Sequence, residues 1–177
     1  MADESPTEEP TPPAEDRRAE VDVLLGVISD THGLLRDSAL DALEGVDRII
    51  HAGDVDEAWI LERLAEVAPV SAVRGNVDRG PWAADLPRTE VVEVGDRLLY
   101  VLHDPDRLDL DPAAAGFDAV IHGHTHDPRN ETADGVLYLN PGSAGRYRRG
   151  HPVTLALLRV PTDAGEEPLK VEFVALD

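Results

Sequence analysis

The pattern of apolar and polar positions predicts that the first half of the chain alternates strands with helices. Runs rich in Val, Ile and Leu at residues 21–30, 46–54 and 70–76 are typical of buried strands. Between them, residues 34–45 and 56–68 carry apolar side chains at helical spacing, and Gly45 is placed to end the first helix. This β-α-β-α-β order predicts a parallel sheet with right-handed crossovers.

The second half of the chain predicts mostly strands. Residues 88–94 and 97–103 are joined by a Gly-Asp turn and predict a hairpin. Four further apolar runs, at 118–124, 136–142, 151–160 and 169–177, predict the remaining strands. With no internal repeat and no linker, residues 21–177 are expected to form one domain with a mixed β core and helices on its outer faces.

The N-terminal residues differ in character from this domain. Residues 1–20 are rich in proline and acidic side chains and have no apolar periodicity, so they are predicted to be a disordered tail. They show neither the basic flank nor the apolar run of a secretory signal, and the apolar runs elsewhere are strand-sized. We therefore expect a cytoplasmic protein.

The charge balance is strongly acidic. The 177 residues include 36 Asp and Glu against 16 Lys and Arg, a formal net charge of −20, and Lys170 is the single lysine. Such a surface repels phosphate backbones, so binding of extended nucleic acid is not expected. The acidity suits either simple solubility or a salt-rich cytoplasm, and the scarcity of lysine favours the second. Cysteine is absent, so any metal must be held by His, Asp, Glu or Asn.

Polar side chains follow the predicted strands at the points where they end. Asp30 and His32 follow the first strand, Asp54 the second, Asn76 the third, and His103 the second strand of the hairpin. In an extended chain Asp30 and His32 would point to the same side and could share one cation. Each position taken alone also fits a helix cap, a turn or a solvated side chain. His51 is out of phase with these tips, which favours a structural role.

The segment His122-Gly123-His124-Thr125-His126 is more specific. Three imidazoles packed together without a cation would repel one another once protonated, so a metal site is favoured. Together with the strand tips, this gives more nitrogen and oxygen ligands than one tetrahedral zinc with an open position can use. The set suits two cations roughly 3.5–4 Å apart that share a carboxylate.

The order of motifs Asp-Thr-His, Gly-Asp, Gly-Asn, a later His and Gly-His-Thr-His resembles the calcineurin-like metallophosphoesterases. The short length and the GNVD and NPGS segments resemble its branch of small bacterial and archaeal phosphodiesterases, which also includes the small subunit of the retromer coat. The resemblance implies an α/β fold, a four-layer α-β-β-α sandwich of two mixed sheets flanked by helices.

The resemblance also assigns the ligands. Asp30, His32 and His126 would hold one ion, Asn76, His103 and His124 the other, and Asp54 would bridge both. Spacing alone would instead place His124 and His126 on a single ion. Asp54, Asn76 and His124 are the residues predicted to act in catalysis.

The implied activity is hydrolysis of a small phosphoester, most simply a phosphodiester, by a hydroxide that two divalent cations activate. Mixed oxygen and nitrogen ligands favour Mn²⁺, with Ni²⁺, Zn²⁺, Fe²⁺ and Mg²⁺ left open. Two alternatives also stay open, an interaction scaffold like the retromer subunit and a phosphomonoesterase. A homo-oligomer is not excluded, and no membrane partner is expected.

Two positions depart from the family pattern. Val77 follows the Gly-Asn asparagine, where many members have a histidine that aids phosphoryl chemistry, and Asp104 stands where glycine is usual. Val77 leaves the general acid unassigned, with Asp78, Asp104 and His151 as candidates. The 140–143 segment fits either an ordinary turn or a support for the site. Nearby Arg146, Arg148 and Arg149 suit either phosphate binding or neutralisation of carboxylates, with the second favoured.

Overall fold

The computed structural model describes residues 22–161 and 167–177 of the chain, and the predicted tail at residues 1–20 lies outside this part. The ten strands in this described part form two five-stranded sheets. The first sheet has the order β10-β9-β1-β2-β3. Its strands span β1 (Val23–Ile28), β2 (Arg48–His51), β3 (Val70–Ala72), β9 (Thr154–Val160) and β10 (Lys170–Ala175). Strands β1, β2 and β3 are parallel, as the alternating pattern predicts, and β9 and β10 are antiparallel additions.

The second sheet has the order β4-β5-β6-β8-β7. Its strands span β4 (Thr89–Val94), β5 (Arg97–Leu102), β6 (Ala119–Ile121), β7 (Arg129–Ala133) and β8 (Val136–Asn140). The predicted β4-β5 hairpin is present, and β5, β6 and β8 run parallel. Strand β7 is not predicted from sequence, because all five of its residues are exposed and carry no apolar alternation.

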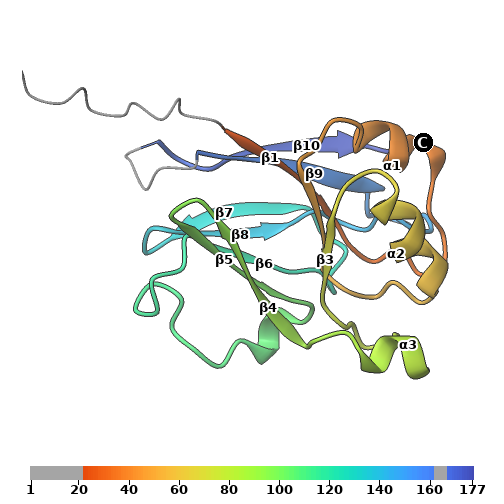
Figure 1. Ribbon diagram of the computed structural model, residues 1–177, viewed down its shortest axis with the longest axis horizontal. Coiled ribbons are helices and arrows are strands. Elements are labelled where there is room, and N and C mark those ends of the chain that lie inside the picture. The colour runs from red at the N-terminus through yellow and green to blue at the C-terminus, as the bar shows by residue number, and fades with distance from the viewer. Residues whose placement is uncertain (1–21, 162–166) are drawn as a thin grey trace, which may run out of the picture.

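The two sheets pack face to face around the main apolar core, as Figure 1 shows. Leu25, Val27 and Ile50 of the first sheet meet Leu99 and Ile121 of the second, and all five are at most 1% exposed. Burial of such side chains contributes roughly 1.5–3 kcal/mol each relative to exposure, so this layer supplies much of the fold's stability. The predicted sandwich of two mixed sheets is confirmed.

Helices α1 (Asp37–Ala42) and α2 (Ala58–Ala65) cover the outer face of the first sheet. Ala39 of α1 and Ile60 and Leu64 of α2 bury their side chains against Ile28 and Ile49. Gly26 of β1 allows the close approach, because a Cβ there would collide with Leu43 just after α1. The short helix α3 (Pro81–Ala84) follows the β3 loop.

The outer face of the second sheet has a thinner cover. The 3₁₀ turn η1 (Pro105–Arg107) leads into a segment whose Leu108, Leu110 and Phe117 pack on Tyr100 and Leu102 of β5. Helical periodicity is absent from this segment, which explains why the sequence predicts no element there. The fourth layer is thus made of one short turn and apolar loop residues.

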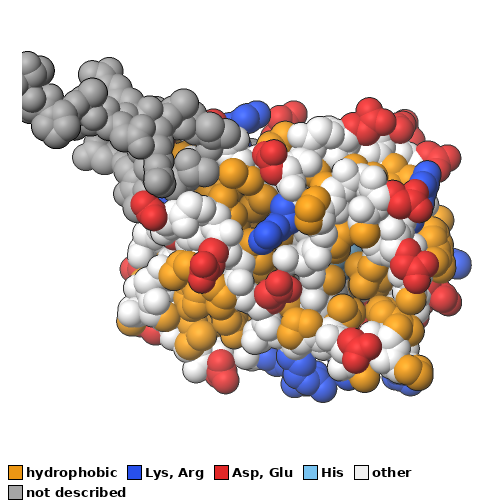
Figure 2. Space-filling view, in the orientation of Figure 1, with side chains coloured by type: hydrophobic (Ala, Val, Ile, Leu, Met, Phe, Trp, Pro, Cys, Tyr) orange, Lys and Arg blue, Asp and Glu red, His pale blue; other side chains and the backbone are white. Residues whose placement is uncertain are grey.

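Figure 2 shows Asp and Glu side chains spread across one face of the molecule instead of gathered in a single patch. Among the described residues, no helix has the length and apolar composition needed to cross a membrane.

Candidate metal centre

The predicted ligands come together at one edge of the sandwich, where parallel strands of both sheets end. Asp30 and His32 follow β1, Asp54 follows β2 and Asn76 lies in the loop after β3. From the second sheet, His103 follows β5, and His124 and His126 lie in the loop after β6. The carboxyl ends of strands are where open α/β sheets place their binding sites. The structure therefore gathers all seven side chains from five separate strand ends.

One group of side chains consists of Asp30, His32 and His126. The Nε2 atom of His126 lies 3.0 Å from Asp30 Oδ1 and 3.2 Å from His32 Nε2. His32 Nε2 lies 3.7 Å from the same Asp30 oxygen. One ligand atom from each residue is thus within reach of a common point, which is the arrangement that a cation requires.

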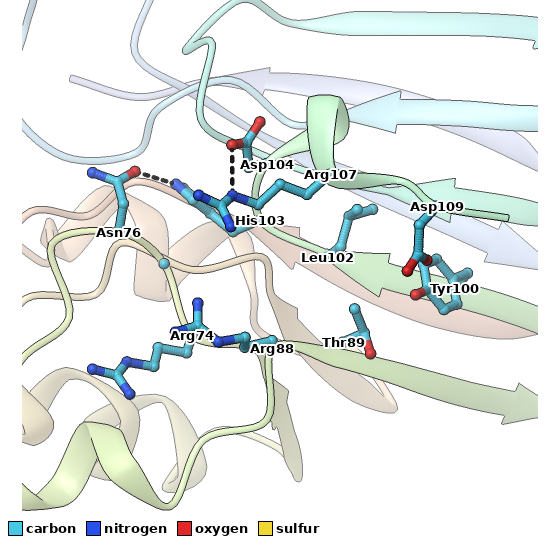
Figure 3. Close-up of a pocket in the computed structure, with 11 residues that line it drawn as sticks. Arg74, Asn76, Arg88, Thr89, Tyr100, Leu102, His103, Asp104, Arg107 and Asp109 are labelled. Atoms are coloured by element: carbon cyan, nitrogen blue, oxygen red, sulfur yellow. Dashed lines mark hydrogen bonds and ion pairs between the residues drawn. The ribbon is translucent and has the colours of Figure 1, made fainter.

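A second group consists of Asn76, His103 and His124. Asn76 Oδ1 lies 3.1 Å from His103 Nε2 and 3.1 Å from His124 Nδ1. Figure 3 shows the Asn76 amide directed at the His103 ring. Asn76 and His124 are exposed while His103 is buried, so this group faces solvent on the side of Asn76 and His124. A small substrate could reach it from that side.

Asp54 lies between the two groups. Its Oδ2 atom is 3.3 Å from His103 Nε2 and 3.9 Å from His32 Nε2, while its Oδ1 accepts the backbone N–H of Val77 at 3.0 Å. Burial raises the pKa of Asp54, but the contact with His103 and the backbone hydrogen bond from Val77 outweigh it and hold the pKa below its usual value. The carboxyl is therefore ionised and has one oxygen directed at both groups.

Asp30 is fully buried and still has an oxygen without a hydrogen bond. Its Oδ2 accepts the Ser29 hydroxyl at 2.6 Å and the His124 backbone N–H at 3.1 Å. Among the described residues Oδ1 accepts no hydrogen bond, although His126 and His32 face it. Burial raises the pKa of Asp30, yet contacts with His126, His32 and Ser29 hold it well below its usual range. A buried, ionised and unpaired oxygen among imidazoles fits a divalent cation.

The tautomer of His103 also fits a cation. Its Nδ1–H donates to the backbone carbonyl of Ala52 at 2.8 Å, which leaves the Nε2 lone pair facing the oxygens of Asn76 and Asp54. Lone pairs in that arrangement repel unless a proton or a metal lies between them. Burial lowers the pKa of His103, but the carboxylates of Asp54 and Asp30 raise it above its usual value. Orientation of a ligating histidine through a backbone carbonyl is common in metal sites.

The backbone at the site is strained. Asp30, His32, Asp54, His124 and His126 all have positive φ angles, between 46° and 70°. Non-glycine residues in this region cost about 1 kcal/mol or more each, so five at one site represent several kcal/mol. All five of these ligands lie on loops, and the other two predicted ligands do not have positive φ angles. Such strain clusters where a structure holds side chains for function.

Glycines next to the ligands leave no room for a side chain. A Cβ on Gly75 would collide with the backbone nitrogen and Oδ1 of Asp54. A Cβ on Gly123 would collide with the Ser29 hydroxyl. Gly53 combines a φ of +92° with a close approach to the His103 ring. The Gly-Asp, Gly-Asn and Gly-His pairs in the sequence thus reflect close packing of the ligand loops on one another.

Three supporting side chains hold these loops. The Asp78 carboxylate accepts backbone N–H groups of both the Asp54 and the Gly75 loops. Asn140 donates to Gly123 O and to the Thr125 hydroxyl, each at 2.9 Å, and Ser143 donates to Asp30 O at 2.9 Å. The 140–143 segment is therefore a support for the site, one of the two readings its sequence allows. Asp78 also accepts the backbone N–H of Asp56, and no sequence signal indicates this role as a triple acceptor.

Two of the remaining histidines lie outside the ligand groups. His51 is fully buried, with Nε2 3.1 Å from the Thr31 hydroxyl and Nδ1 accepting the Gly53 N–H at 3.2 Å. Burial lowers its pKa to about 4, so the ring is neutral. His122 is 5% exposed and its Nδ1 contacts Gly123 O at 3.2 Å; burial lowers its pKa too. Both rings bond to backbone or hydroxyl groups around the site.

The arginine-rich segment lies at the rim of the first group. Arg148 Nη2 is 3.4 Å from His32 Nε2. In the described part of the chain, no ion pair links Arg146, Arg148 or Arg149 to a carboxylate. The favoured reading, that these arginines neutralise carboxylates, therefore finds no support, and Arg148 is placed to meet an anion bound at the site.

The chain is similar in sequence to known phosphoesterases. Residues 23–163 match the family model of the calcineurin-like phosphoesterase superfamily domain. A probable metallophosphoesterase of Methanocaldococcus jannaschii is 40% identical over 134 residues, which cover 68% of each chain. The phosphodiesterase YfcE of Escherichia coli is 31% identical over 157 residues, covering 73% of this chain and 84% of YfcE.

A solved structure shares the fold at lower identity. Vacuolar protein sorting 29 of Cryptosporidium parvum superposes with a TM-score of 0.69 at 20% identity, over 88% of this chain and 98% of that one.

Proposed function

The chain belongs to the calcineurin-like phosphoesterase superfamily, and we propose from its metal centre that it hydrolyses phosphodiesters with two divalent cations. As a metallophosphoesterase it is a metal-dependent hydrolase of phosphoric esters. The preference for diesters follows relatives such as YfcE, which is named a phosphodiesterase.

The observation that carries the two-metal proposal is the position of Asp54. Its Oδ2 lies between His32 of one ligand group and His103 of the other. Asp30, His32 and His126 would hold the first ion, and Asn76, His103 and His124 the second. Two ions in such a site lower the pKa of bound water and neutralise charge on the phosphoryl oxygens.

The chain's own residues have distinct roles in this proposal. Asp54 fixes the spacing between the two groups. Asn76 and His124, which are exposed, face the incoming phosphoryl group and orient it. Arg148 lies at the opposite rim, where its guanidinium can donate to a phosphoryl oxygen. Val77 has no proton to offer, so the leaving group departs without a general acid at that position.

We propose Mn²⁺ as the working ion. The six groups around Asp54 comprise hard oxygens from Asp30 and Asn76 and borderline nitrogens from histidine, with no thiolate. This mixture suits Mn²⁺, and Ni²⁺, Zn²⁺, Fe²⁺ and Mg²⁺ are the alternatives to compare. Activity after chelation and reloading with each ion at equal free concentration would rank them. A higher kcat/KM with any other ion would overturn the choice of Mn²⁺.

A non-catalytic scaffold is the alternative from a different class. The fold shared with vacuolar protein sorting 29 allows it, and Val77 in place of a histidine is its one favourable observation. The strained backbone at five ligands speaks for catalysis, because a scaffold gains nothing from that cost.

The proposal is tested by hydrolysis of bis(p-nitrophenyl) phosphate by the chelated chain with and without Mn²⁺. Asp30→Asn should lower kcat/KM by about a thousandfold, since several kcal/mol of transition-state stabilisation depend on the ions and each 1.4 kcal/mol is tenfold. Asp96→Asn, at an exposed turn, is the matched control. No metal-dependent hydrolysis would favour the scaffold, and faster turnover of p-nitrophenyl phosphate would favour a phosphomonoesterase.

A further inference from the structure

A cleft of about 380 Å³ opens directly beside the second ligand group. Three arginines line it: Arg74 in the loop after β3, Arg88 just before β4 and Arg107 in η1. We call this cleft the arginine pocket; Asn76, His103 and Asp104 also line it. A cleft of this size suits a small polar group or part of a small ligand.

The arginine pocket shares a wall with the metal centre. Asn76 and His103, two of the proposed ligands, form one end of it, as Figure 3 shows. In that view Arg74 and Arg88 lie on one side of His103, and Arg107 is paired with Asp104. Part of a molecule whose phosphorus is held at these ligands can therefore occupy the adjoining pocket.

The loops that carry Arg74 and Arg88 are tied together. The backbone N–H of Arg74, just after β3, donates to Pro87 O at 2.7 Å, immediately before Arg88 and β4. Arg74 is half-buried, and its Nε donates to Asp78 O at 3.3 Å. That bond orients the guanidinium and leaves both of its terminal nitrogens for a ligand. Asp78 in turn holds the Asp54 loop, so the pocket and the metal centre share one support.

Among the described residues, no carboxylate pairs with Arg74 or Arg88. Within residues 22–161 and 167–177, no ion pair involves Arg74 or Arg88. Of the two carboxylates that line the pocket, Asp104 caps η1 and accepts Arg107 Nε at 3.2 Å. Asp109 lies at the end of the pocket near Tyr100, away from Arg74 and Arg88 in Figure 3.

The strongly negative charge of the chain makes the unpaired Arg74 and Arg88 significant for substrate binding. A chain with a net charge of −20 repels anionic substrates at long range, so a phosphoester needs local cations to bind. Guanidinium groups form two parallel hydrogen bonds to phosphate oxygens, and two unpaired arginines match the two negative charges of a phosphate monoester. A substrate with a single phosphodiester at the metal centre would leave Arg74 and Arg88 unused.

We infer that the arginine pocket binds a second phosphate group of the substrate. The preferred substrates are then small phosphodiesters that also carry a terminal phosphate, such as 3′-phosphorylated nucleotide esters. This inference rests on the proposed phosphodiesterase function and specifies its substrate class. Arg74 and Arg88 are the specificity-determining residues, and Arg107 completes the rim.

Two matched chromogenic substrates test the inference. Thymidine 5′-(p-nitrophenyl phosphate), with and without a 3′-phosphate, releases the same phenol from the same diester. In the Mn²⁺-loaded chain the phosphorylated substrate should show a kcat/KM higher by about tenfold or more, mainly through KM, as charge-assisted hydrogen bonds to phosphate predict. A ratio near 1 in the unaltered chain would overturn the inference.

Variants distinguish phosphate binding in the arginine pocket from a general effect of the charge of the protein. Arg88→Gln should bring the ratio of the two kcat/KM values close to 1, and Arg88→Lys should restore part of it. Arg63→Gln, on the exposed surface of α2, removes the same charge elsewhere and should leave the ratio as it was. The inference would also be overturned if Arg88→Gln left the ratio of the two kcat/KM values unchanged, or if Arg63→Gln lowered it equally.

Calorimetry distinguishes failure of the inference from failure of the proposed function. Release of phenol from neither substrate would contradict the phosphodiesterase proposal. In that case, the affinities of the metal-loaded chain for thymidine 3′,5′-bisphosphate and for thymidine 5′-phosphate still test whether the pocket binds a second phosphate group. The bisphosphate should bind about tenfold tighter or more, and Arg88→Gln should remove the difference. Equal affinities would overturn the inference independently of any turnover.

Discussion

The buried carboxylate of Asp78 accepts the backbone N–H of Asp54 over 3.1 Å. It also accepts the N–H groups of Gly75 and Asp56, each at 2.7 Å, and is only 1% exposed. One side chain thus ties the loop after β2, which carries Asp54, to the loop after β3, which carries Asn76. The spacing between the proposed bridging ligand and a ligand of the second ion depends on this contact.

Asp78→Asn should therefore weaken metal binding although Asp78 is not a proposed ligand. An amide keeps one accepting oxygen and turns an NH₂ group toward a backbone N–H. Loss of such a supporting contact typically costs about 10–100-fold in metal affinity or activity. Calorimetric titration with Mn²⁺ measures it, with Asp85→Asn on the exposed surface as control. Unchanged affinity in the Asp78 variant would show that the loops hold their spacing without it.

Gly75→Ala tests the close packing of the ligand loops. The added methyl group would collide with Asp54, and overpacking of this kind typically costs about 1–3 kcal/mol of unfolding free energy. The variant should also lose metal, because relief of the clash displaces Asp54. Gly116→Ala is the control, since a Cβ there meets nothing within 4 Å and only its φ of +81° is unfavourable. Denaturant unfolding and metal analysis of both variants give the comparison, and full metal content in Gly75→Ala would contradict the packing argument.

The buried neutral His51 predicts a dependence of stability on pH. Its pKa is about 4 in the folded chain and about 6.5 in the unfolded chain, so the unfolded state takes up the proton first as pH falls. The neutral His51 ring therefore contributes to the free energy of unfolding above pH 6.5. This contribution is lost as pH falls toward 4, by about 2 kcal/mol between pH 7.5 and 5.

The contribution of His51 is measured by unfolding of the chelated chain in denaturant across this pH range. His51→Gln, whose amide can still donate to Thr31, should remove it, while His122 continues to titrate in both proteins. The difference between the two curves isolates His51. Parallel curves for the original chain and the variant would contradict a neutral, buried His51.

Val77 predicts that the rate of hydrolysis depends strongly on the pKa of the leaving group. A positioned general acid contributes on the order of 10²–10⁴-fold, and valine cannot supply it. Two of the three other candidates are engaged elsewhere, since Asp78 accepts backbone N–H groups and Asp104 pairs with Arg107. The third, His151, has a buried Nδ1 without a hydrogen-bond partner among the described residues. A plot of log kcat/KM against leaving-group pKa should therefore be steep. Val77→His should flatten the slope, and a shallow slope in the unaltered chain would mean that another residue donates the proton.

Much of the site could be predicted because its ligands follow strands that the apolar pattern identifies. Asp54 and His103 come directly after such runs, and parallel strands bring their ends to one edge. The assignment of His124 and His126 could not come from spacing. The expectation that residues i and i+2 point to the same side holds for extended backbone, but His124 and His126 have left-handed φ angles. Asp30 and His32 have such angles too and still lie in one group, so spacing alone does not decide which group a side chain joins. The structure places His124 beside Asn76 and His126 beside Asp30.

The features that sequence reasoning missed depend on tertiary contacts. Strand β7 has no buried residue, and it exists because a turn at Asp134-Gly135 folds it onto β8. Arg74, Arg88 and Arg107 are separated by 14 and 19 positions and follow no local pattern. Only the packing of the β3 and β4 loops beside η1 brings them around one cleft.

The central claim is that Asp54 joins two cations in one site, and metal content tests it most directly. Elemental analysis of the Mn²⁺-reconstituted chain should give two ions per molecule, and Asp96→Asn should match it. Asp54→Asn should hold at most one ion, because each group loses the oxygen it shares with the other. Two ions retained in Asp54→Asn, or a single ion in the unaltered chain, would contradict the account.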